Sequence, residues 1–311
     1  MEDKKKIVVI CGPTASGKTG LSLVLAEKYN GEIISADSMQ VYRKLDVGTA
    51  KATAEEQSKA THHLVDILDP SEPYNVQLFV EKANKIIEDI TSRGKLPIIA
   101  GGTGLYIESL INGISFSDQP DNTEMKNQLK EELEEKGSEY MYGVLKEIDP
   151  EYAEKVHPNN TVRVLRAIEI YKLTGHTMTW QLRNSKPKEK PYDSLLIGLS
   201  FEDRQKLYDN INYRVDLMME QNVLDEAKYV YDNRDTFKTC VSAIGYKEFF
   251  PYFDNEKSLE ECVEKLKQAS RNYAKRQLTW FNRMKEINWL MIDKVDYKES
   301  AVNLVQEFLD N

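Results

Sequence analysis

Short apolar runs alternate with amphipathic stretches of helical length through the first hundred residues, and the alternation returns near residue 195. Between the runs, residues 21–29 and 75–90 repeat apolar side chains at helical spacing. Three apolar runs are too short for buried helices and predict strands: residues 7–11, 96–100 and 195–199. Residues 31–37 predict a further short strand that ends in an acidic residue. Strands that alternate with helices in this way indicate an α/β protein with a parallel sheet.

The pattern changes in the middle of the chain, where no strand is predicted and the helices are highly charged. Residues 125–136 and 140–148 have the spacing of amphipathic helices. We therefore expect an all-helical domain inserted into the α/β core. The expected boundaries are 1–115 for the first part of the core, 116–193 for the helical insertion and 194–311 for the second part of the core.

The first predicted strand runs directly into the pattern G-x-x-x-x-G-K-[ST] at residues 12–19. Its glycines let the backbone turn so that successive N–H groups face one point, and the N-terminus of the following helix adds its dipole. In such phosphate-binding loops the lysine, here Lys18, reaches the outer phosphate oxygens, and the last hydroxyl, here that of Thr19, ligates Mg²⁺. Such a loop does not distinguish the phosphates of ATP from a free diphosphate. The motif therefore predicts a nucleotide or diphosphate site.

Two further strand ends are expected beside this loop, because the carboxyl ends of parallel strands lie at one edge of the sheet. Asp37 ends the second strand, and a second glycine-rich turn, residues 101–106, follows the third. Two such turns would give one pocket two walls of backbone N–H groups. Neither strand end carries the apolar run plus Asp-Glu of many ATP-hydrolysing enzymes, which makes ATP hydrolysis a weak candidate.

Composition narrows the classes of function. With 41% hydrophobic and 30% charged residues the chain is typical of a globular protein, and no apolar run approaches membrane-spanning length. The first residues resemble neither a signal nor a transit peptide. The widely spaced Cys11, Cys240 and Cys262 favour reduced thiols in a cytoplasm over disulfides or structural zinc. We therefore expect a cytoplasmic protein without a membrane partner.

Charge is unevenly distributed. The net charge of −9 argues against coating nucleic acid through bulk electrostatics. Residues 118–155 nevertheless hold twelve acidic residues against five lysines, whereas residues 265–285 hold seven basic and no acidic residues. This separation of acidic and basic stretches indicates a negatively charged partner that binds at the basic stretch. The basic stretch is interleaved with Tyr273, Trp280 and Phe281, which favours contact with a nucleic-acid backbone over the plainer alternative of a solvated helix face.

Six motifs follow one another along the chain: Gly-Pro-Thr-Ala-Ser-Gly-Lys-Thr at 12–19, Asp-Ser-Met-Gln-Val-Tyr-Arg at 37–43, Gly-Gly-Thr-Gly-Leu-Tyr at 101–106, His-Pro-Asn-Asn-Thr-Val-Arg at 157–163, Ala-Ile-Gly-Tyr-Lys-Glu at 243–248 and Ala-Lys-Arg-Gln at 274–277. Together they resemble the bacterial tRNA dimethylallyltransferase family, also called tRNA isopentenyltransferases. The resemblance implies a P-loop NTPase-like core with a helical insertion that grips the anticodon stem-loop. It also implies a Mg²⁺-dependent enzyme that transfers a prenyl group from dimethylallyl diphosphate to N6 of the adenosine immediately 3′ of the anticodon.

The resemblance further implies roles for individual residues. The diphosphate would be held by Gly12, Pro13, Thr14, Ala15, Ser16, Gly17, Lys18 and Thr19, with Mg²⁺ on Thr19 and Arg214 as a further cation. Catalysis would involve Asp37 as the general base, together with Lys18, Thr19 and Thr103. The tRNA would be contacted by Asp37, Ser38, Met39, Gln40, Thr103, Lys126, Val162, Arg163, Val164, Leu165, Arg166, Ala243, Ile244, Gly245, Tyr246, Lys247 and Glu248. The basic stretch adds Arg271, Lys275 and Arg276 as expected tRNA contacts.

Two of these residues have a plainer interpretation from their chemistry alone. An aspartate near a phosphate-binding loop most often supports a Mg²⁺ ion from its outer coordination sphere, whereas the resemblance favours Asp37 as the base that takes the proton of the adenine amine. Gln40 carries the donor and acceptor that suit an adenine edge, or it is a polar loop residue without base contact.

Other classes of function remain open. A small-molecule P-loop kinase, or an enzyme that prenylates free adenylate, would use the same phosphate loop, and an RNA-binding module would keep a nucleotide site only for regulation. The insertion and the basic stretch favour tRNA, because a mononucleotide substrate requires neither. We expect a monomer that binds tRNA and dimethylallyl diphosphate.

Overall fold

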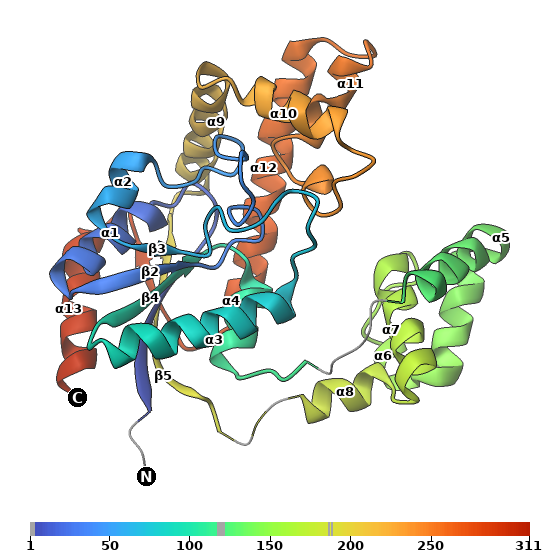
Figure 1. Cartoon of the computed structure of the whole chain (residues 1–311), viewed down its shortest axis with the longest axis horizontal. Coiled ribbons are helices and arrows are strands. Elements are labelled where there is room, and N and C mark those ends of the chain that lie inside the picture. Colours follow the sequence, from blue (N-terminus) through green and yellow to red (C-terminus); the bar gives the residue numbers. More distant parts are fainter. Residues whose placement is uncertain (1–3, 117–121, 186, 188) are drawn as a thin grey trace. The chain divides into compact units, whose positions relative to one another are not determined.

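The computed structural model describes residues 4–116, 122–185, 187 and 189–311, and it divides into two compact units. The core unit comprises Met1–Ile111 and Pro191–Asn311, and the insertion unit comprises Asn112–Lys190. Within the insertion expected at 116–193, residues 117–121, 186 and 188 lie outside the described part. Figure 1 shows the described elements of both units along the chain.

One parallel sheet forms the centre of the core unit. Its strands, as the described residues give them, are β1 (Lys5–Cys11), β2 (Gly31–Ser35), β3 (His62–His63), β4 (Leu96–Gly101), β5 (Tyr192–Ser200) and β6 (Ile287–Met291), in the order β3-β2-β4-β1-β5-β6. β1 lies between β4 and β5, with Val8 opposite Ile98 on one side and Leu195 on the other. The α/β protein with a parallel sheet that the short apolar runs predict is confirmed.

Helices cover both faces of this sheet (Figure 1). The helices described in the core unit are α1 (Lys18–Lys28), α2 (Ala54–Lys59), α3 (Val76–Ser92), α4 (Gly104–Ile111), α9 (Arg204–Glu220), α10 (Val223–Asp232), α11 (Phe250–Phe253), α12 (Leu259–Phe281) and α13 (Tyr297–Asp310), with 3₁₀ turns η1 (Cys240–Ser242) and η2 (Lys247–Phe249). Leu25 of α1 and Val305 of α13 pack in one cluster with Ile10, so these two helices share a face. α3 and α4 lie against β4 on the opposite face.

Burial on both faces explains the composition of the central strand. Every residue from 7 to 11 is 0% exposed, so each position of β1 inside the sheet requires an apolar side chain. Gly12 comes directly after β1, and Asp37 comes shortly after β2. The local sequence therefore places the candidate chemistry at the carboxyl edge of the sheet.

The insertion unit has a separate apolar core. Its described elements are the helices α5 (Thr123–Ile148), α6 (Pro150–Ala153), α7 (Thr161–Thr174) and α8 (Met178–Asn184). Leu129, Leu145 and Ile168 are buried together in this core. α5 is interrupted at Gly137, whose φ of 83° is not helical, near the boundary between the two helices predicted from the sequence.

The entry and the exit of the insertion unit lie side by side, because the N–H of Ser115 donates to the carbonyl of Ser185 across 2.8 Å. In neither unit does any helix of the described ranges combine the length and the apolarity needed to cross a bilayer.

Candidate active site

Three strand ends of the core unit meet at the phosphate-binding loop. β1 runs into residues 12–17, and α1 begins directly after them. Gly17 precedes α1 with a φ of 83°, and no side chain caps the helix, so its first turn suits an anionic ligand. Asp37 follows β2, and the second glycine-rich turn follows β4.

Gly12 occupies a position that admits no side chain. Its φ of 141° favours glycine, and a Cβ atom would lie 2.3 Å from the carbonyl oxygen of Leu199 in β5. The loop therefore packs directly against the neighbouring strand. Within the loop, Ser16 is 0% exposed, and its hydroxyl has no hydrogen-bond partner among the described residues. A buried hydroxyl without a partner is costly, so we expect a ligand or water to bind it.

Two cations and one carboxylate face each other beside this loop. The Lys18 ammonium donates to the carbonyl oxygen of Pro13 across 2.6 Å. Burial, and then the nearby Arg214 guanidinium, lower the pKa of Lys18 to about 8, while Asp37 acts in the opposite sense. Burial also lowers the pKa of Arg214, against the attraction of Asp37. Two half-buried cations of this kind suit an anion that carries more than one negative charge, such as a diphosphate.

A pocket of about 240 Å³ lies at the loop, and we call it the phosphate pocket. Its lining includes Thr14, Ala15, Ser16, Gly17, Lys18 and Thr19 from the loop, and Asp37, Gln40, Gly101, Gly102, Arg214, Tyr273 and Gln277 from other segments. The structure thus brings most of the predicted diphosphate-binding residues to one cavity. Gly12 and Pro13 are instead buried where the loop leaves β1.

A second pocket, of about 280 Å³, meets the phosphate pocket at Asp37, and we call it the side pocket. Both pockets are lined by Thr14, Asp37, Thr49, Arg214 and Tyr273. The side pocket is also lined by Ser38, Met39, Gly48, Ser242, Ala243, Ile244, Gly245, Lys247 and Arg276. A carboxylate therefore stands where two cavities meet, which suits proton transfer from a group bound in the second cavity.

The Asp37 carboxylate is held by its own turn. Oδ1 accepts the backbone N–H of Met39 across 2.8 Å and that of Gln40 across 3.3 Å. These bonds orient the carboxylate at the junction of the two pockets. The hydroxyl of Thr103, predicted to act in catalysis, is buried near the start of α4 and has no hydrogen-bond partner within the described residues.

Gln277 is a site residue to which the sequence pattern assigns no role of its own, and Tyr273 is expected only as an aromatic residue of the basic stretch. Gln277 of α12 is 6% exposed; its Oε1 accepts the N–H of Thr14 across 2.8 Å, and its Nε2 donates to the carbonyl of Gly102 across 2.9 Å. It joins the phosphate loop to the second glycine-rich turn, and Tyr273 lines both pockets. The available signal is a glutamine at a buried position of an amphipathic helix, three residues after the fully buried Ala274.

The side chain of Gln40 binds three other residues of the chain. Its Oε1 accepts the hydroxyl of Ser35 across 2.8 Å, and its Nε2 donates to the carbonyls of Thr49 at 3.2 Å and Ala50 at 3.1 Å. Both amide protons are used within the chain, so contact with an adenine edge would have to replace these bonds. These bonds hold the loop, and the contact of Gln40 with tRNA stays a prediction.

The motif at 243–248 divides into residues that line the side pocket and residues that support them. Ala243, Ile244, Gly245 and Lys247 are in the first group. Tyr246 is 0% exposed, and Glu248, whose Oε2 accepts the N–H of Gly245 across 3.0 Å, is 8% exposed. These two buried side chains shape the loop from inside, and the expected tRNA contacts of Tyr246 and Glu248 stay a prediction.

The cations of α12 also differ in their surroundings. Arg271 donates to Oδ1 of Asn212 on α9 across 2.5 Å, so it joins two helices. Lys275 and Arg276 are exposed, and the Arg276 guanidinium lies 5.6 Å from the ring centroid of Tyr273. Of the three basic residues expected to contact tRNA, Lys275 and Arg276 therefore offer the more open charges.

The insertion unit carries further expected tRNA contacts. Val162 is 79% exposed, whereas Val164 is 1% exposed and packs in the helical core, so the side chain of Val164 is not available to RNA. Arg166 forms an ion pair with Glu169 across 2.8 Å. Of the others, Lys126 and Arg163 are exposed and Leu165 is half-buried.

Sequence comparison identifies a family over most of the chain. The family model described as IPP transferase matches residues 40–284, and one described as isopentenyl transferase matches residues 5–67. A tRNA dimethylallyltransferase of Thermoanaerobacter sp. (strain X514) is 47% identical over 307 residues, which cover 97% of this chain and 96% of that protein. One from Lactobacillus acidophilus is also 47% identical and covers 98% of this chain and 99% of its own length.

Solved structures agree with these matches. The full-length tRNA isopentenylpyrophosphate transferase from Bacillus halodurans is 43% identical, covers 99% of both chains and superposes with a TM-score of 0.71. A eukaryotic dimethylallyltransferase acting on tRNA is 33% identical, covers 99% of this chain and 80% of its own, and gives a TM-score of 0.83. The phosphate loop, the two pockets that meet at Asp37 and the near-complete match to these enzymes agree, and the chain belongs to the tRNA dimethylallyltransferase family.

Proposed function

We propose that the protein transfers the dimethylallyl group of dimethylallyl diphosphate to the N6 amine of the adenosine immediately 3′ of the anticodon in tRNA, and releases diphosphate. One observation carries the proposal: Asp37 is shared by a pocket with two half-buried cations, Lys18 and Arg214, and by a second pocket. The relatives named tRNA dimethylallyltransferases support the choice of prenyl donor and of RNA acceptor.

The phosphate pocket is suited to the leaving group. As the C–O bond breaks, negative charge grows on the diphosphate, and Lys18, Arg214 and the first turn of α1 are already placed to stabilise it. A Mg²⁺ ion fits the donor set, because Thr19 and the unpartnered Ser16 bring hydroxyl oxygens to the pocket and the diphosphate brings its own. When bound, the ion would neutralise part of the charge on the departing diphosphate.

The side pocket is suited to the acceptor. The adenine amine is a weak nucleophile because its lone pair is delocalised into the ring. As N6 bonds to C1 of the dimethylallyl group, the C–O bond to diphosphate breaks and the extra proton on N6 passes to the Asp37 carboxylate. To reach this point the base has to leave its stack, which a single-stranded anticodon loop allows at little cost.

The proposal also covers the oligomeric state of the protein and the compartment in which it acts. We expect the protein to act as a monomer in the cytoplasm, where tRNA is available. Cys11, Cys240 and Cys262 are all free and buried, which supports a reducing compartment.

Labelled dimethylallyl diphosphate provides the direct test. The protein is incubated with an anticodon stem-loop that carries adenosine 3′ of the anticodon, with the same stem-loop carrying purine riboside at that position, or with AMP. We expect label only in the first RNA, because purine riboside lacks the N6 amine. Label in AMP and never in RNA would replace the proposal with an adenylate prenyltransferase. Label in the purine riboside RNA would contradict the assignment of the acceptor atom.

A further inference from the structure

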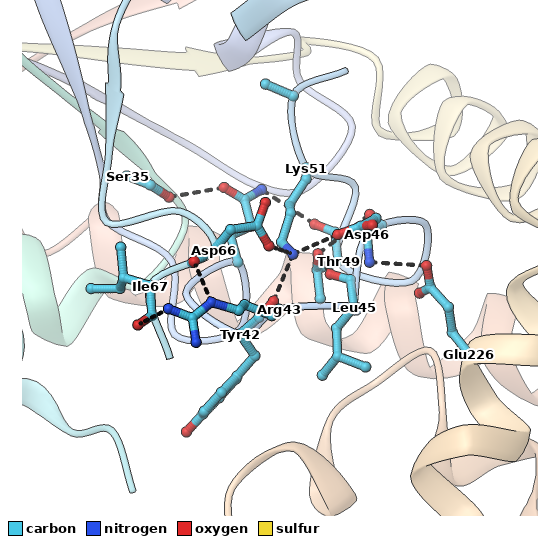
Figure 2. A network of polar contacts seen from close by, with 12 residues as sticks. Ser35, Tyr42, Arg43, Leu45, Asp46, Thr49, Lys51, Asp66, Ile67 and Glu226 are labelled. Carbon is cyan, nitrogen blue, oxygen red and sulfur yellow. Dashed lines mark hydrogen bonds and ion pairs between the residues drawn. The ribbon is translucent and has the colours of Figure 1, made fainter. Parts of the chain in front are cut away.

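The carboxylate of Glu226, on α10, binds a loop that lies far away in the sequence (Figure 2). Its Oε1 accepts the backbone N–H groups of Asp46 at 2.9 Å and Val47 at 2.8 Å. Its Oε2 accepts the N–H of Gly48 at 3.0 Å and the hydroxyl of Tyr246 at 2.9 Å. Three consecutive amides and one phenol thus converge on one part-buried carboxylate, in the arrangement with which backbone amides bind anions.

A carboxylate is the side chain that satisfies these four donors. It accepts at both oxygens and offers no proton, whereas the amide of glutamine has one accepting oxygen and directs N–H groups at the remaining donors. Glu226→Gln would therefore keep the size of the side chain. Its NH₂ group, however, would point at N–H or O–H groups of the loops, so that donors would face donors. Hydrogen bonds to an ionised acceptor are also about twice as strong as neutral ones. The charge at position 226, more than its volume, is what the loops require.

The two segments that Glu226 joins both line the side pocket. Gly48 comes from one segment, and Gly245 comes from the other, next to Tyr246. They are packed closely, because a Cβ atom on Gly48 would lie 2.5 Å from the ring of Tyr246 and one on Gly245 would lie 3.1 Å from the carbonyl oxygen of Gly48. A shift of one segment therefore displaces the other and changes the wall of the side pocket.

The same loop reaches Asp37 through Gln40. The carbonyl of Thr49 accepts the Gln40 side chain at 3.2 Å, and the backbone N–H of Gln40 donates to the Asp37 carboxylate at 3.3 Å. At its far end the loop is anchored by Lys51, whose side chain is 3% exposed and whose ammonium contacts Asp46 at 2.6 Å. A continuous series of contacts thus runs from α10 to the carboxylate shared by the two pockets.

We infer that Glu226 is a positioning residue for the acceptor half of the reaction. It fixes the wall of the side pocket in which the adenine would lie and, through Gln40, the orientation of Asp37. The inference rests on the proposed function, because that function assigns the side pocket to the adenine. Glu226 is not among the residues that line either pocket in the described part of the chain, so it acts through the loops that it holds.

Glu226→Gln tests the inference in the full-length protein with labelled dimethylallyl diphosphate and the anticodon stem-loop. We expect kcat at saturating substrates to fall about tenfold to a hundredfold, because small misplacements of reacting groups have effects of this size. The dissociation constant of dimethylallyl diphosphate, measured by equilibrium binding, should change far less than kcat, since Glu226, within the described residues, has no bond to Lys18 or Arg214, the cations that face the anion. Asp225→Asn, which removes the exposed carboxylate next to it on α10, is the matched control and should keep the native kcat. An unchanged kcat in Glu226→Gln, or a parallel loss of diphosphate affinity, would overturn the inference.

A loss of stability alone is separated from mispositioning in two ways. Unfolding would lower the melting temperature and would leave kcat native at temperatures well below the transition, whereas mispositioning lowers kcat at every temperature. Tyr246→Phe removes one of the four donors, and we expect a smaller loss of kcat alone and no further loss when it is combined with Glu226→Gln. Additive losses in the double variant would show that the two residues act separately, against the inference.

The two proposals also fail in different ways. If the proposed function were wrong, neither the native protein nor Asp225→Asn would transfer label to the stem-loop. If only the role of Glu226 were wrong, the native protein would transfer label and Glu226→Gln would match it.

Discussion

The side-chain oxygen of Gln277 accepts a hydrogen bond from the backbone N–H of Thr14 across 2.8 Å, although the two residues are 263 positions apart. The nitrogen of the same amide donates to the carbonyl of Gly102. One buried side chain of α12 thus ties the phosphate loop to the second glycine-rich turn. Since Tyr273 and Arg276 of α12 also line the side pocket, one helix contributes to both cavities.

Gln277→Leu should weaken the phosphate pocket. The N–H of Thr14 and the carbonyl of Gly102 lose their partner, and we expect the free energy of unfolding to fall by about 1–3 kcal/mol. The affinity for dimethylallyl diphosphate should fall as well, because the loop loses a support. Denaturant unfolding and equilibrium binding measure the two effects. Gln268→Leu changes an exposed glutamine of the same helix and is the control; equal losses in both variants would contradict a specific role for Gln277.

Asp37→Asn should abolish turnover and spare diphosphate binding. The asparagine oxygen can still accept the N–H groups of Met39 and Gln40, so the turn is kept, but an amide does not take the proton. General bases contribute about 10²- to 10⁴-fold, and we expect the single-turnover rate to fall by that amount. The dissociation constant of dimethylallyl diphosphate is measured in parallel. A similar loss in that constant would instead make Asp37 an anchor for ligand or metal.

Affinity for dimethylallyl diphosphate should decrease as the pH rises through about 8. The pKa of Lys18 lies near that value in the free protein, and the protonated ammonium is the form that binds the anion. Below pH 8 the free protein is already charged, so affinity is constant; above it, binding must first return the proton, and affinity falls by up to about tenfold per pH unit. Calorimetry in two buffers of different ionisation enthalpy should detect proton uptake at about pH 9 and much less at about pH 7.3, where both the Lys18 ammonium and the last phosphate group of the ligand are mostly in their binding forms.

Arg214→Met checks the cause of this pH dependence. It removes a cation that lowers the pKa of Lys18, so the fall in affinity should begin at a higher pH, even though binding is weaker overall. An affinity of the native protein that stays constant from about pH 7 to 9.5 would contradict the low pKa of Lys18.

Lys275→Glu should weaken RNA binding and lower its dependence on salt. The side chain is exposed on the basic helix, and loss of one phosphate contact reduces the slope of log K against log salt by about one. Fluorescence anisotropy with a labelled stem-loop at several salt concentrations gives the slope. Lys298→Glu, which reverses an exposed charge on α13, is the control. An unchanged slope would show that Lys275 does not contact an RNA phosphate and lies on a solvated helix face.

Arg271→Glu should behave differently from Lys275→Glu. Arg271 is bound to Asn212 of α9, so its reversal disturbs the contact between two helices as well as any contact with RNA. We expect a lower melting temperature for Arg271→Glu and a native one for Lys275→Glu, measured by thermal unfolding. The same melting temperature for both variants would contradict a structural role for the Arg271 bond.

The strands and the phosphate loop are predictable because their signals are local. A strand buried on both faces requires an apolar side chain at each position, and residues 7–11 display this requirement directly. The place of Asp37 follows from the common direction of parallel strands. β3 has no such signal, because its two residues, His62 and His63, are too few for any periodicity.

The contacts that support the site are not predictable in this way. Gln277 reaches Thr14 across 263 positions and Glu226 reaches Val47 across 179, and no local pattern encodes which distant backbone group a polar side chain meets. Val164 illustrates the opposite error: its motif suggests a contact with RNA, whereas its place on α7 buries it at 1% exposure. Motifs therefore indicate where the candidate site lies, and tertiary packing decides which side chains of the motifs are buried.

The hydrogen bond between Ser115 and Ser185 joins the incoming and outgoing segments of the insertion unit a few residues inside its bounds. A segment closed in this way can be excised or exchanged with a short link, because closing a short gap costs little loop entropy. The helical unit therefore has the geometry of a cassette. Its surface can diverge, lengthen or be swapped between relatives while the sheet and its two pockets are inherited unchanged.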